Sequence, residues 1–167
     1  MKINIEDIKT KIIIYPTDTI YGIGCNALDS KLVNRIREIK RRDKKPFSVI
    51  APSKKWIRDN FFVNEKDLDK LPGRYTLILK MKRKLVADNV SFSDKLGVRI
   101  PEHEISKIVE KANIPFITTS VNFSGKPYAK EIKEIPKEIL DKVDIVIDAG
   151  KLDNKPSTII MGGKVLR

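Results

Sequence analysis

The apolar residues of this chain occur in short runs that end at proline or glycine, and this feature limits what the chain can fold into. The run at residues 11–15 stops at Pro16, and the run at 97–100 stops at Pro101. Such runs are too short for buried helices and are rich in β-branched residues, which is typical of strands. The sequence predicts strands at residues 11–15, 47–51, 75–81, 97–100, 115–119, 144–148, 157–161 and 164–166, the last two as a hairpin.

Helical patterns lie between several of these runs. After Asp29 or Ser30, either of which can cap a helix, apolar residues recur at helical spacing. These residues are Leu32, Val33, Ile36 and Ile39. Shorter helices are predicted between Asn64 and Pro72, at 103–113 and at 135–140. Strands and helices do not alternate strictly, so the sequence predicts an α/β fold with a mixed parallel and antiparallel sheet, in a single domain spanning residues 1–167.

The charge of the chain bears on its partners. Lysine and arginine number 34 against 22 aspartates and glutamates, a formal net charge of +12. This excess favours polyanionic partners, and a solvated surface of the kind found in heat-adapted proteins is the alternative. No apolar run approaches the ~20 residues of a membrane span, and the N-terminus lacks a signal-peptide cleavage site. We therefore expect a cytoplasmic protein that does not bind membranes.

The chain contains one cysteine, Cys25, and one histidine, His103. One cysteine excludes an internal disulfide, and the pair is too small for an ordinary Cys/His zinc site. We therefore expect no metal held by protein side chains. His103 is expected to be structural or to lie at the rim of a site, and Cys25 to be a small half-buried residue.

Polar side chains gather directly after the first predicted strand, in the stretch PTDTIYGIG at residues 16–24. Hydroxyl groups there can fix a small polar ligand, and Gly22 and Gly24 would let backbone amides approach it in a turn. The alternative is a turn in which Asp18 bonds its own backbone. The stretch lacks the spacing of a Walker loop or a Rossmann fingerprint, so alone it identifies no nucleotide site.

Two further stretches carry groups that suit phosphates. Residues 40–46, KRRDKKP, are mostly cationic, although a solvated helix end explains most charge runs. In residues 118–127, TTSVNFSGKP, the side chains of Ser120, Asn122 and Ser124 alternate and would share one face of an extended backbone. Neutral donors beside a cationic cluster suit nucleotide phosphates and ribose, and an ordinary polar loop is the alternative.

Seven blocks, taken in order, resemble the YrdC-like family of threonylcarbamoyl-AMP synthases. The blocks are PTDTIYGIG at 16–24, Lys40-x-Arg42, KPFSV at 45–49, PGRYTL at 72–77, GVRIPEH at 97–103, S-x-N-x-SG at 120–125 and PST at 156–158. Each block alone is weak evidence. Together they run through nearly the whole chain in the family's order, which makes the resemblance specific.

The resemblance implies the family's twisted, open α/β sandwich and a nucleotidyltransferase activity. Family members condense L-threonine, bicarbonate or CO2, and ATP into threonylcarbamoyl-AMP and pyrophosphate, with Mg2+ accompanying the ATP. A transferase complex then uses the product to modify tRNA beside the anticodon, so tRNA or that complex is an expected partner. Because the reactants are anionic, positioning and cationic stabilisation can carry the reaction without a protein nucleophile.

The family pattern also implies roles for individual residues. Threonine would be bound by Thr19, Arg99, Ser120 and Ser157, with Arg99 forming a fork on the substrate carboxylate. Lys40 and Arg42 would be catalytic and hold the phosphates of ATP. ATP binding would also involve Lys45, Asn122 and Arg167.

The chain departs from the family pattern at several positions. Asp43 stands where many members have proline, Ile50 where they have histidine, and Arg74 where they have proline. The chain stops at Arg167, so the single-domain form is expected. A non-catalytic module that binds tRNA or double-stranded RNA is the alternative function. A carbamoyl-transferring relative from hydrogenase maturation fits less well, because those proteins are much longer and carry zinc-binding cysteines.

Overall fold

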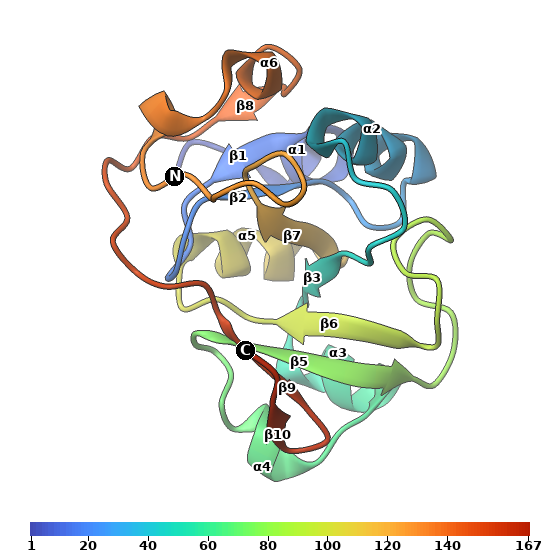
Figure 1. The fold of residues 1–167 in the computed structure, drawn as a ribbon. Coiled ribbons are helices and arrows are strands. Elements are labelled where there is room, and N and C mark those ends of the chain that lie inside the picture. Colours follow the sequence, from blue (N-terminus) through green and yellow to red (C-terminus); the bar gives the residue numbers. More distant parts are fainter.

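The computed structural model describes residues 1–167, and strands from the whole length of the chain join one sheet (Figure 1). The strands are β1 (Ile13–Tyr15), β2 (Gly22–Gly24), β3 (Ser48–Ile50), β4 (Phe61–Phe62), β5 (Tyr75–Met81), β6 (Lys95–Arg99), β7 (Phe116–Ser120), β8 (Ile145–Val146), β9 (Thr158–Met161) and β10 (Lys164–Val165). Their order is β10-β9-β5-β6-β3-β7-β2-β1-β8, and β4 pairs with β5. The pairs β1–β8, β3–β6 and β5–β9 are parallel and the others antiparallel, so the predicted mixed sheet is confirmed.

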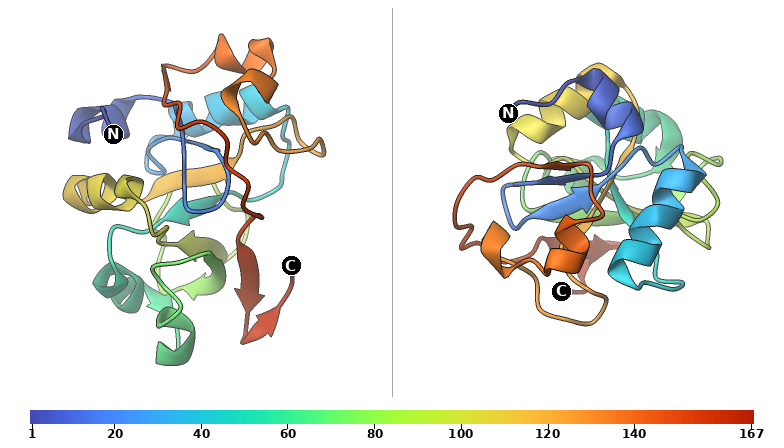
Figure 2. Two further views of the ribbon diagram at one scale, coloured as in Figure 1. Left: turned by 90° about the vertical axis from the view of Figure 1, so that its left-hand side faces the viewer. Right: turned by 90° about the horizontal axis from the view of Figure 1, so that it is seen from above.

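Helices cover both faces of the sheet (Figure 2). They are α1 (Ile5–Thr10), α2 (Ser30–Lys40), α3 (Lys54–Asn60), α4 (Glu65–Leu68), α5 (Glu104–Ala112) and α6 (Lys137–Leu140), with a 3-10 turn η1 (Ile132–Glu134) before α6. Helices α1 and α5 pack together on one side, and α2 and α6 on the other. Side chains along the first strand point alternately to the two faces of the sheet. Ile13 and Tyr15 pack in the core that includes α5, and Ile12 and Ile14 pack in the core that includes α2.

The sequence pattern does not predict α1, α3, β2 or β4. Helix α1 begins at a capping box in which Asn4 accepts from the backbone N–H of Asp7 and Asp7 accepts from that of Asn4. Helix α3 begins where the Ser53 hydroxyl accepts from the backbone N–H of Trp56. These signals are local and present in the sequence, but they precede short helices with little apolar periodicity.

The prediction of a glycine turn is wrong for Gly22–Gly24. These residues form β2, which pairs antiparallel with both β1 and β7. A Cβ at Gly24 would overlap the carbonyl oxygen of Ile117 and lie 2.7 Å from the Phe116 ring. Gly24 is therefore needed for the close approach of two strands, not for the approach of a ligand.

Gly24→Ala is expected to destabilise the fold by roughly 3 kcal/mol, because a backbone carbonyl cannot move aside as a flexible side chain can. For a chain of this length the melting temperature should fall by about 6–12 °C. Gly162→Ala is the control: its φ of +58° strains a side chain, but no atom lies within 4 Å of the new Cβ. Thermal melting of both variants tests the argument, which fails if the two lose equal stability.

Candidate active site

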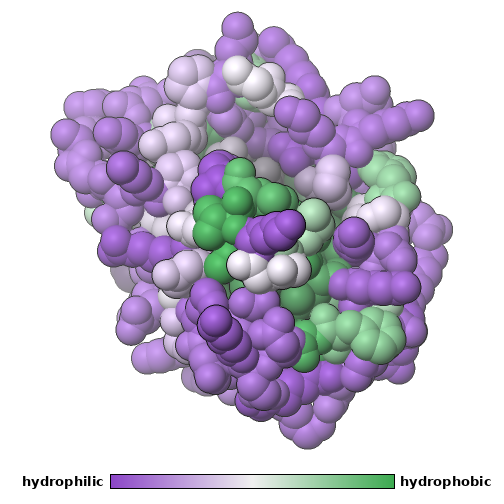
Figure 3. Space-filling view, turned by 60° about the horizontal axis from the view of Figure 1, so that its bottom comes forward, coloured by the Kyte–Doolittle hydropathy of each residue, from purple (hydrophilic) through white to green (hydrophobic).

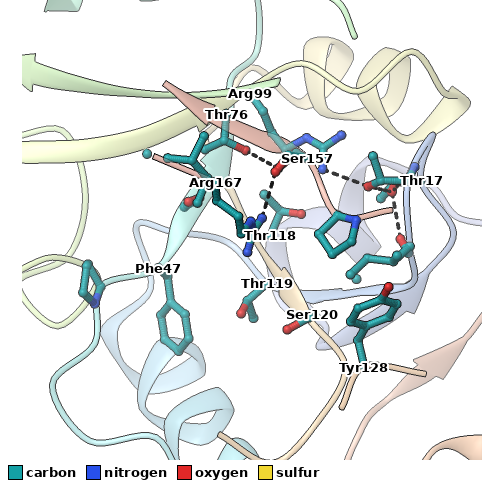
Figure 4. A pocket seen from close by; sticks show the side chains of 18 of the residues that line it. Thr17, Phe47, Thr76, Arg99, Thr118, Thr119, Ser120, Tyr128, Ser157 and Arg167 are labelled. Atoms are coloured by element: carbon teal, nitrogen blue, oxygen red, sulfur yellow. Dashed lines mark hydrogen bonds between the residues drawn. The ribbon is translucent and has the colours of Figure 1, made fainter. Parts of the chain in front are cut away.

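A cavity of about 720 Å3 lies over the sheet and is lined by residues of β2, β3, β5, β6, β7, β9 and the loops beside them (Figure 4). Of its 24 lining residues, none is an aspartate or a glutamate. The charged side chains in the lining are Arg42, Lys95, Arg99 and Arg167. Positive charge and neutral hydroxyls around a space without carboxylates favour an anionic ligand.

Paired hydroxyl groups line two parts of the cavity. In the loop between β1 and β2, the Oγ1 atoms of Thr17 and Thr19 lie 3.0 Å apart, and Thr17 also donates to the carbonyl of Ile20 at 2.8 Å. Beside β9, the hydroxyls of Thr76 and Ser157 lie 2.7 Å apart (Figure 4). These contacts fix the hydroxyl oxygens at defined points. Thr17 uses its full hydrogen-bonding capacity on Thr19 and Ile20, whereas the hydroxyls of Thr19, Thr76 and Ser157 can still accept from a ligand.

Arg99, the last residue of β6, is a buried cation in the cavity wall. Its Nη1 donates to Thr19 Oγ1 at 3.2 Å, and its Nη2 donates to Asp18 Oδ1 at 2.5 Å. The Nε–H is buried and has no partner. Burial lowers the pKa of Arg99, and the Asp18 carboxylate opposes that shift. A buried guanidinium with a free N–H is suited to bind a carboxylate or a phosphate.

Lys40, the last residue of α2, has no exposed surface and does not line the cavity. Its Nζ donates to the carbonyls of Ser120 and Asn122 and, at 2.8 Å, to Asn122 Oδ1. An ammonium has three hydrogens, so these contacts use all of them. The predicted direct contact between Lys40 and a phosphate stays a prediction, because it would require the ammonium to leave these acceptors.

Lys40 therefore acts as a support for the loop after β7 in this structure. Ser120 Oγ donates to Asn122 Oδ1 at 3.0 Å, and the backbone N–H of Ser124 donates to the Lys40 carbonyl at 2.8 Å. Ser120 and Asn122 line the cavity, but Ser124 does not. The expected shared face of the three side chains thus holds for two of them, because the chain turns after Asn122 instead of staying extended.

Arg42 reaches the cavity from the loop that follows α2, while Lys45 does not. The Arg42 side chain donates from Nη2 to the Pro46 carbonyl at 2.7 Å, and its Cζ lies 5.0 Å from the centre of the Phe47 ring. Burial and the charge of Arg37 lower the pKa of Arg42. The Lys45 side chain is exposed outside the lining, and its carbonyl accepts from Arg37 and Arg42.

The remaining predicted site residues lie in the cavity wall. Thr19, Ser157 and Arg167 all line it, and Arg167 Nη2 donates to the Ser157 carbonyl at 2.9 Å. Sequence reasoning did not single out several other lining residues. They are Thr17, Thr76, Lys95, Thr118 and Tyr128. Thr17 and Thr118 belong to the stretches at 16–24 and 118–127, and Thr76 to the block at 72–77, although none of the three was given a role. Lys95 and Tyr128 sit in a strand and in a loop where a polar residue carries no distinguishing signal.

Neither Cys25 nor His103 lines the cavity. Cys25 is buried, and burial raises the pKa of its thiol, which makes it a poor nucleophile. His103 caps α5, where its Nδ1 accepts from the backbone N–H of Ile105 at 3.4 Å. The structural role expected for His103 agrees with this position. No cluster of three or more His, Cys, Asp or Glu side chains is arranged to hold a metal ion.

The face seen in Figure 3 is mostly hydrophilic, with hydrophobic side chains gathered near its middle. At the edge of the sheet, β10 and the residue after it expose Val165 and Leu166. The same hairpin contributes Ile159 and Arg167 to the cavity lining.

Among the helices, none is both long and apolar enough to cross a membrane.

Comparison with known proteins shows to which family the chain belongs. The model of the Sua5/YciO/YrdC family, described as telomere recombination, matches residues 8–167. The chain belongs to this family. A relative from Methanocaldococcus jannaschii, a putative threonylcarbamoyl-AMP synthase, is 46% identical over 161 residues, which cover 93% of this chain and 76% of the relative. The threonylcarbamoyl-AMP synthase of Pyrococcus abyssi is 30% identical over 84% of this chain and 44% of its own length.

Solved structures of Sua5/YciO/YrdC relatives share the fold. Sua5 from P. abyssi in complex with L-threonine superposes with a TM-score of 0.82, at 30% identity over 94% of this chain and 50% of that one. Full-length HypF in a phosphate- and nucleotide-bound form superposes with a TM-score of 0.80, at 25% identity over 90% of this chain and 25% of HypF. The chain thus spans about half the length of the P. abyssi protein.

Proposed function

We propose that the cavity is the active site of an L-threonylcarbamoyladenylate synthase, a nucleotidyltransferase that joins L-threonine, bicarbonate or CO2, and ATP. The observation that carries the proposal is the lining itself: four cationic side chains, many hydroxyls and no aspartate or glutamate. Three anionic reactants repel one another, and such a lining offsets that repulsion where they meet. The names of the synthase relatives support threonylcarbamoyl-AMP as the product, and the threonine-bound Sua5 structure supports threonine as a substrate.

The amino acid would bind at the end of the cavity formed by Thr19 and Arg99. The guanidinium of Arg99, which lines the cavity, offers charged donors for the threonine carboxylate. Thr19, Ser120 and Ser157 supply hydroxyls that suit the amine and side-chain hydroxyl of threonine. This assignment keeps the four threonine-binding residues that the family pattern implies.

The nucleotide would bind along the wall formed by Arg42, Asn122 and Arg167. These residues provide two guanidinium groups and an amide for phosphate oxygens and ribose. Lys45, exposed beside the loop of Arg42, would attract the triphosphate from outside the lining. Lys40 would act mainly by fixing the side chain of Asn122, because its Nζ donates to Asn122 Oδ1.

The reaction requires alignment more than proton transfer. The threonine amine attacks CO2 and loses a proton, which gives a carbamate. A carbamate oxygen then attacks the α-phosphorus of ATP, the bond from that phosphorus to the bridging oxygen breaks, and pyrophosphate leaves. Arg42 would stabilise the charge that develops on the α-phosphate of the transferred adenylyl group. Mg2+, as part of the ATP substrate, would be held by phosphate oxygens and water.

The decisive assay measures pyrophosphate release from ATP. We expect release to require both threonine and bicarbonate, and the nucleotide product to be a mixed anhydride that decays to AMP. Pyrophosphate release that continues at the same rate without threonine or without bicarbonate would contradict the proposal. Supply of this product for threonylcarbamoyl modification of tRNA, in the cytoplasm and through a transferase complex, is the biological role we propose.

A non-catalytic module that binds tRNA or double-stranded RNA is the second candidate, and the net charge of +12 favours it. It predicts salt-sensitive RNA binding without adenylate formation. An RNA-binding titration over a range of salt concentrations, run beside the pyrophosphate assay, separates the two functions. RNA binding with an inactive cavity would favour this second candidate.

A further inference from the structure

The side chain of Asp18 lies behind the cavity wall, in contact with Arg99. It does not line the cavity, and 7% of it is exposed. Asp18 Oδ1 accepts from Arg99 Nη2, and Asp18 Oδ2 accepts from the backbone N–H of Glu102 at 2.8 Å. The Asp18 carbonyl accepts from Asn154 Nδ2 at 3.3 Å. Asp18 thus joins the β1–β2 loop to the end of β6, to the turn before α5 and to the segment before β9.

These contacts restrict the guanidinium of Arg99. Its Nη1 is held by Thr19 and its Nη2 by Asp18, so rotation about the last bonds of the side chain would break at least one contact. The Nε–H remains without a partner. An arginine that is already ordered loses less conformational entropy when it binds a ligand than a free one does.

We propose that Asp18 is a positioning residue, which orients the guanidinium of Arg99 for the carboxylate of the amino-acid substrate and thereby sets the affinity for threonine. The inference rests on the proposed function. It concerns a residue that the family pattern did not assign to the site.

Simple electrostatics predicts the opposite effect of Asp18. A carboxylate close to Arg99 reduces the positive potential that attracts the substrate carboxylate, so its neutralisation should strengthen binding if charge alone mattered. If orientation dominates, neutralisation should weaken binding. Asparagine has one acceptor oxygen, so it cannot accept from both the guanidinium and the Glu102 N–H, and its bond to the guanidinium lacks the carboxylate's charge. The sign of the change in threonine affinity therefore decides between the two.

The test compares Asp18→Asn with Asp144→Asn. Asp144 also accepts a backbone N–H, that of Ile12 at 2.8 Å, and pairs with an arginine, Arg35, but it lies outside the cavity. We expect Asp18→Asn to raise the KM for threonine about tenfold, with kcat and the KM for ATP changed less than about twofold. Asp144→Asn should change none of the three, and calorimetric titration with threonine should reproduce the tenfold loss.

A second measurement does not depend on turnover. The hydrogen-exchange rate of the Arg99 Nε–H, followed by NMR, should rise in Asp18→Asn and stay unchanged in Asp144→Asn. An unchanged or lower KM for threonine, or an unchanged exchange rate, overturns the proposal, as does a wild type that fails to bind threonine. Wild-type protein that binds threonine but releases no pyrophosphate contradicts the proposed function alone, and the titration and exchange rate then decide the role of Asp18.

Discussion

Arg42→Ala is expected to lower kcat/KM for ATP by roughly 100- to 1000-fold, the usual loss when a donor to developing transition-state charge is removed. Arg42 lines the cavity and makes its hydrogen bonds to backbone carbonyls of its own loop. Its removal should therefore cost about 1 kcal/mol of stability or less. Pyrophosphate release at varied ATP, together with thermal melting, measures both quantities.

Two variants sharpen this test. Arg35→Ala removes a half-exposed arginine outside the cavity and should leave activity unchanged. Arg42→Lys keeps a charge but loses the planar fork, so it should recover only part of the activity. Normal turnover by Arg42→Ala would show that Arg42 takes no part in the reaction.

Lys40→Met is expected to abolish most activity through the loop after β7. Methionine has a similar length, but it removes the ammonium that donates to the carbonyls of Ser120 and Asn122, and it leaves Asn122 Oδ1 with the Ser120 hydroxyl as its remaining donor. Each buried oxygen left unpaired costs roughly 1–3 kcal/mol, and we expect the loop to rearrange and displace Asn122 from the cavity. Lys31→Met, an exposed change on the same helix, is the control and should have no effect.

The stability lost in Lys40→Met should depend on pH. Burial and the charge of Arg42 lower the pKa of Lys40 to about 7. An unfolded lysine has a pKa of about 10.4, so between these values the unfolded chain binds more protons and wild-type stability rises with pH. Relative to the variant, wild type should gain about 2 kcal/mol between pH 7 and pH 9. Chemical denaturation at both pH values tests this, and a difference that stays constant would contradict the lowered pKa.

Much of the fold could be predicted because strand signals in this chain are local. The strand Tyr75–Met81 and the hairpin of β9 and β10 lie where the apolar runs and the paired glycines place them. β2 escaped prediction because Gly22–Gly24 carries a single side chain, Ile23, between two glycines, and its pairing with β1 and β7 makes it a strand. That information is tertiary and absent from a local pattern.

The residues of the candidate site could also be predicted only in part from the sequence. Ordered blocks of sequence pointed to Thr19, Arg42, Arg99 and Asn122, which the fold brings to one cavity. The sequence could not show that Lys40, two residues before Arg42, turns beneath the loop instead of into the cavity. Position on the last turn of α2 decides this, because Lys40 still belongs to the helix whereas Arg42 follows it.

The make-up of the cavity wall bears on the fate of a reactive product. An acyl–phosphate anhydride is destroyed by water when a nearby base removes a proton from that water. The wall contains no aspartate, glutamate, histidine or cysteine, so the side chains best able to act as such a base are missing from it. A labile anhydride held there would be shielded from hydrolysis until it departs.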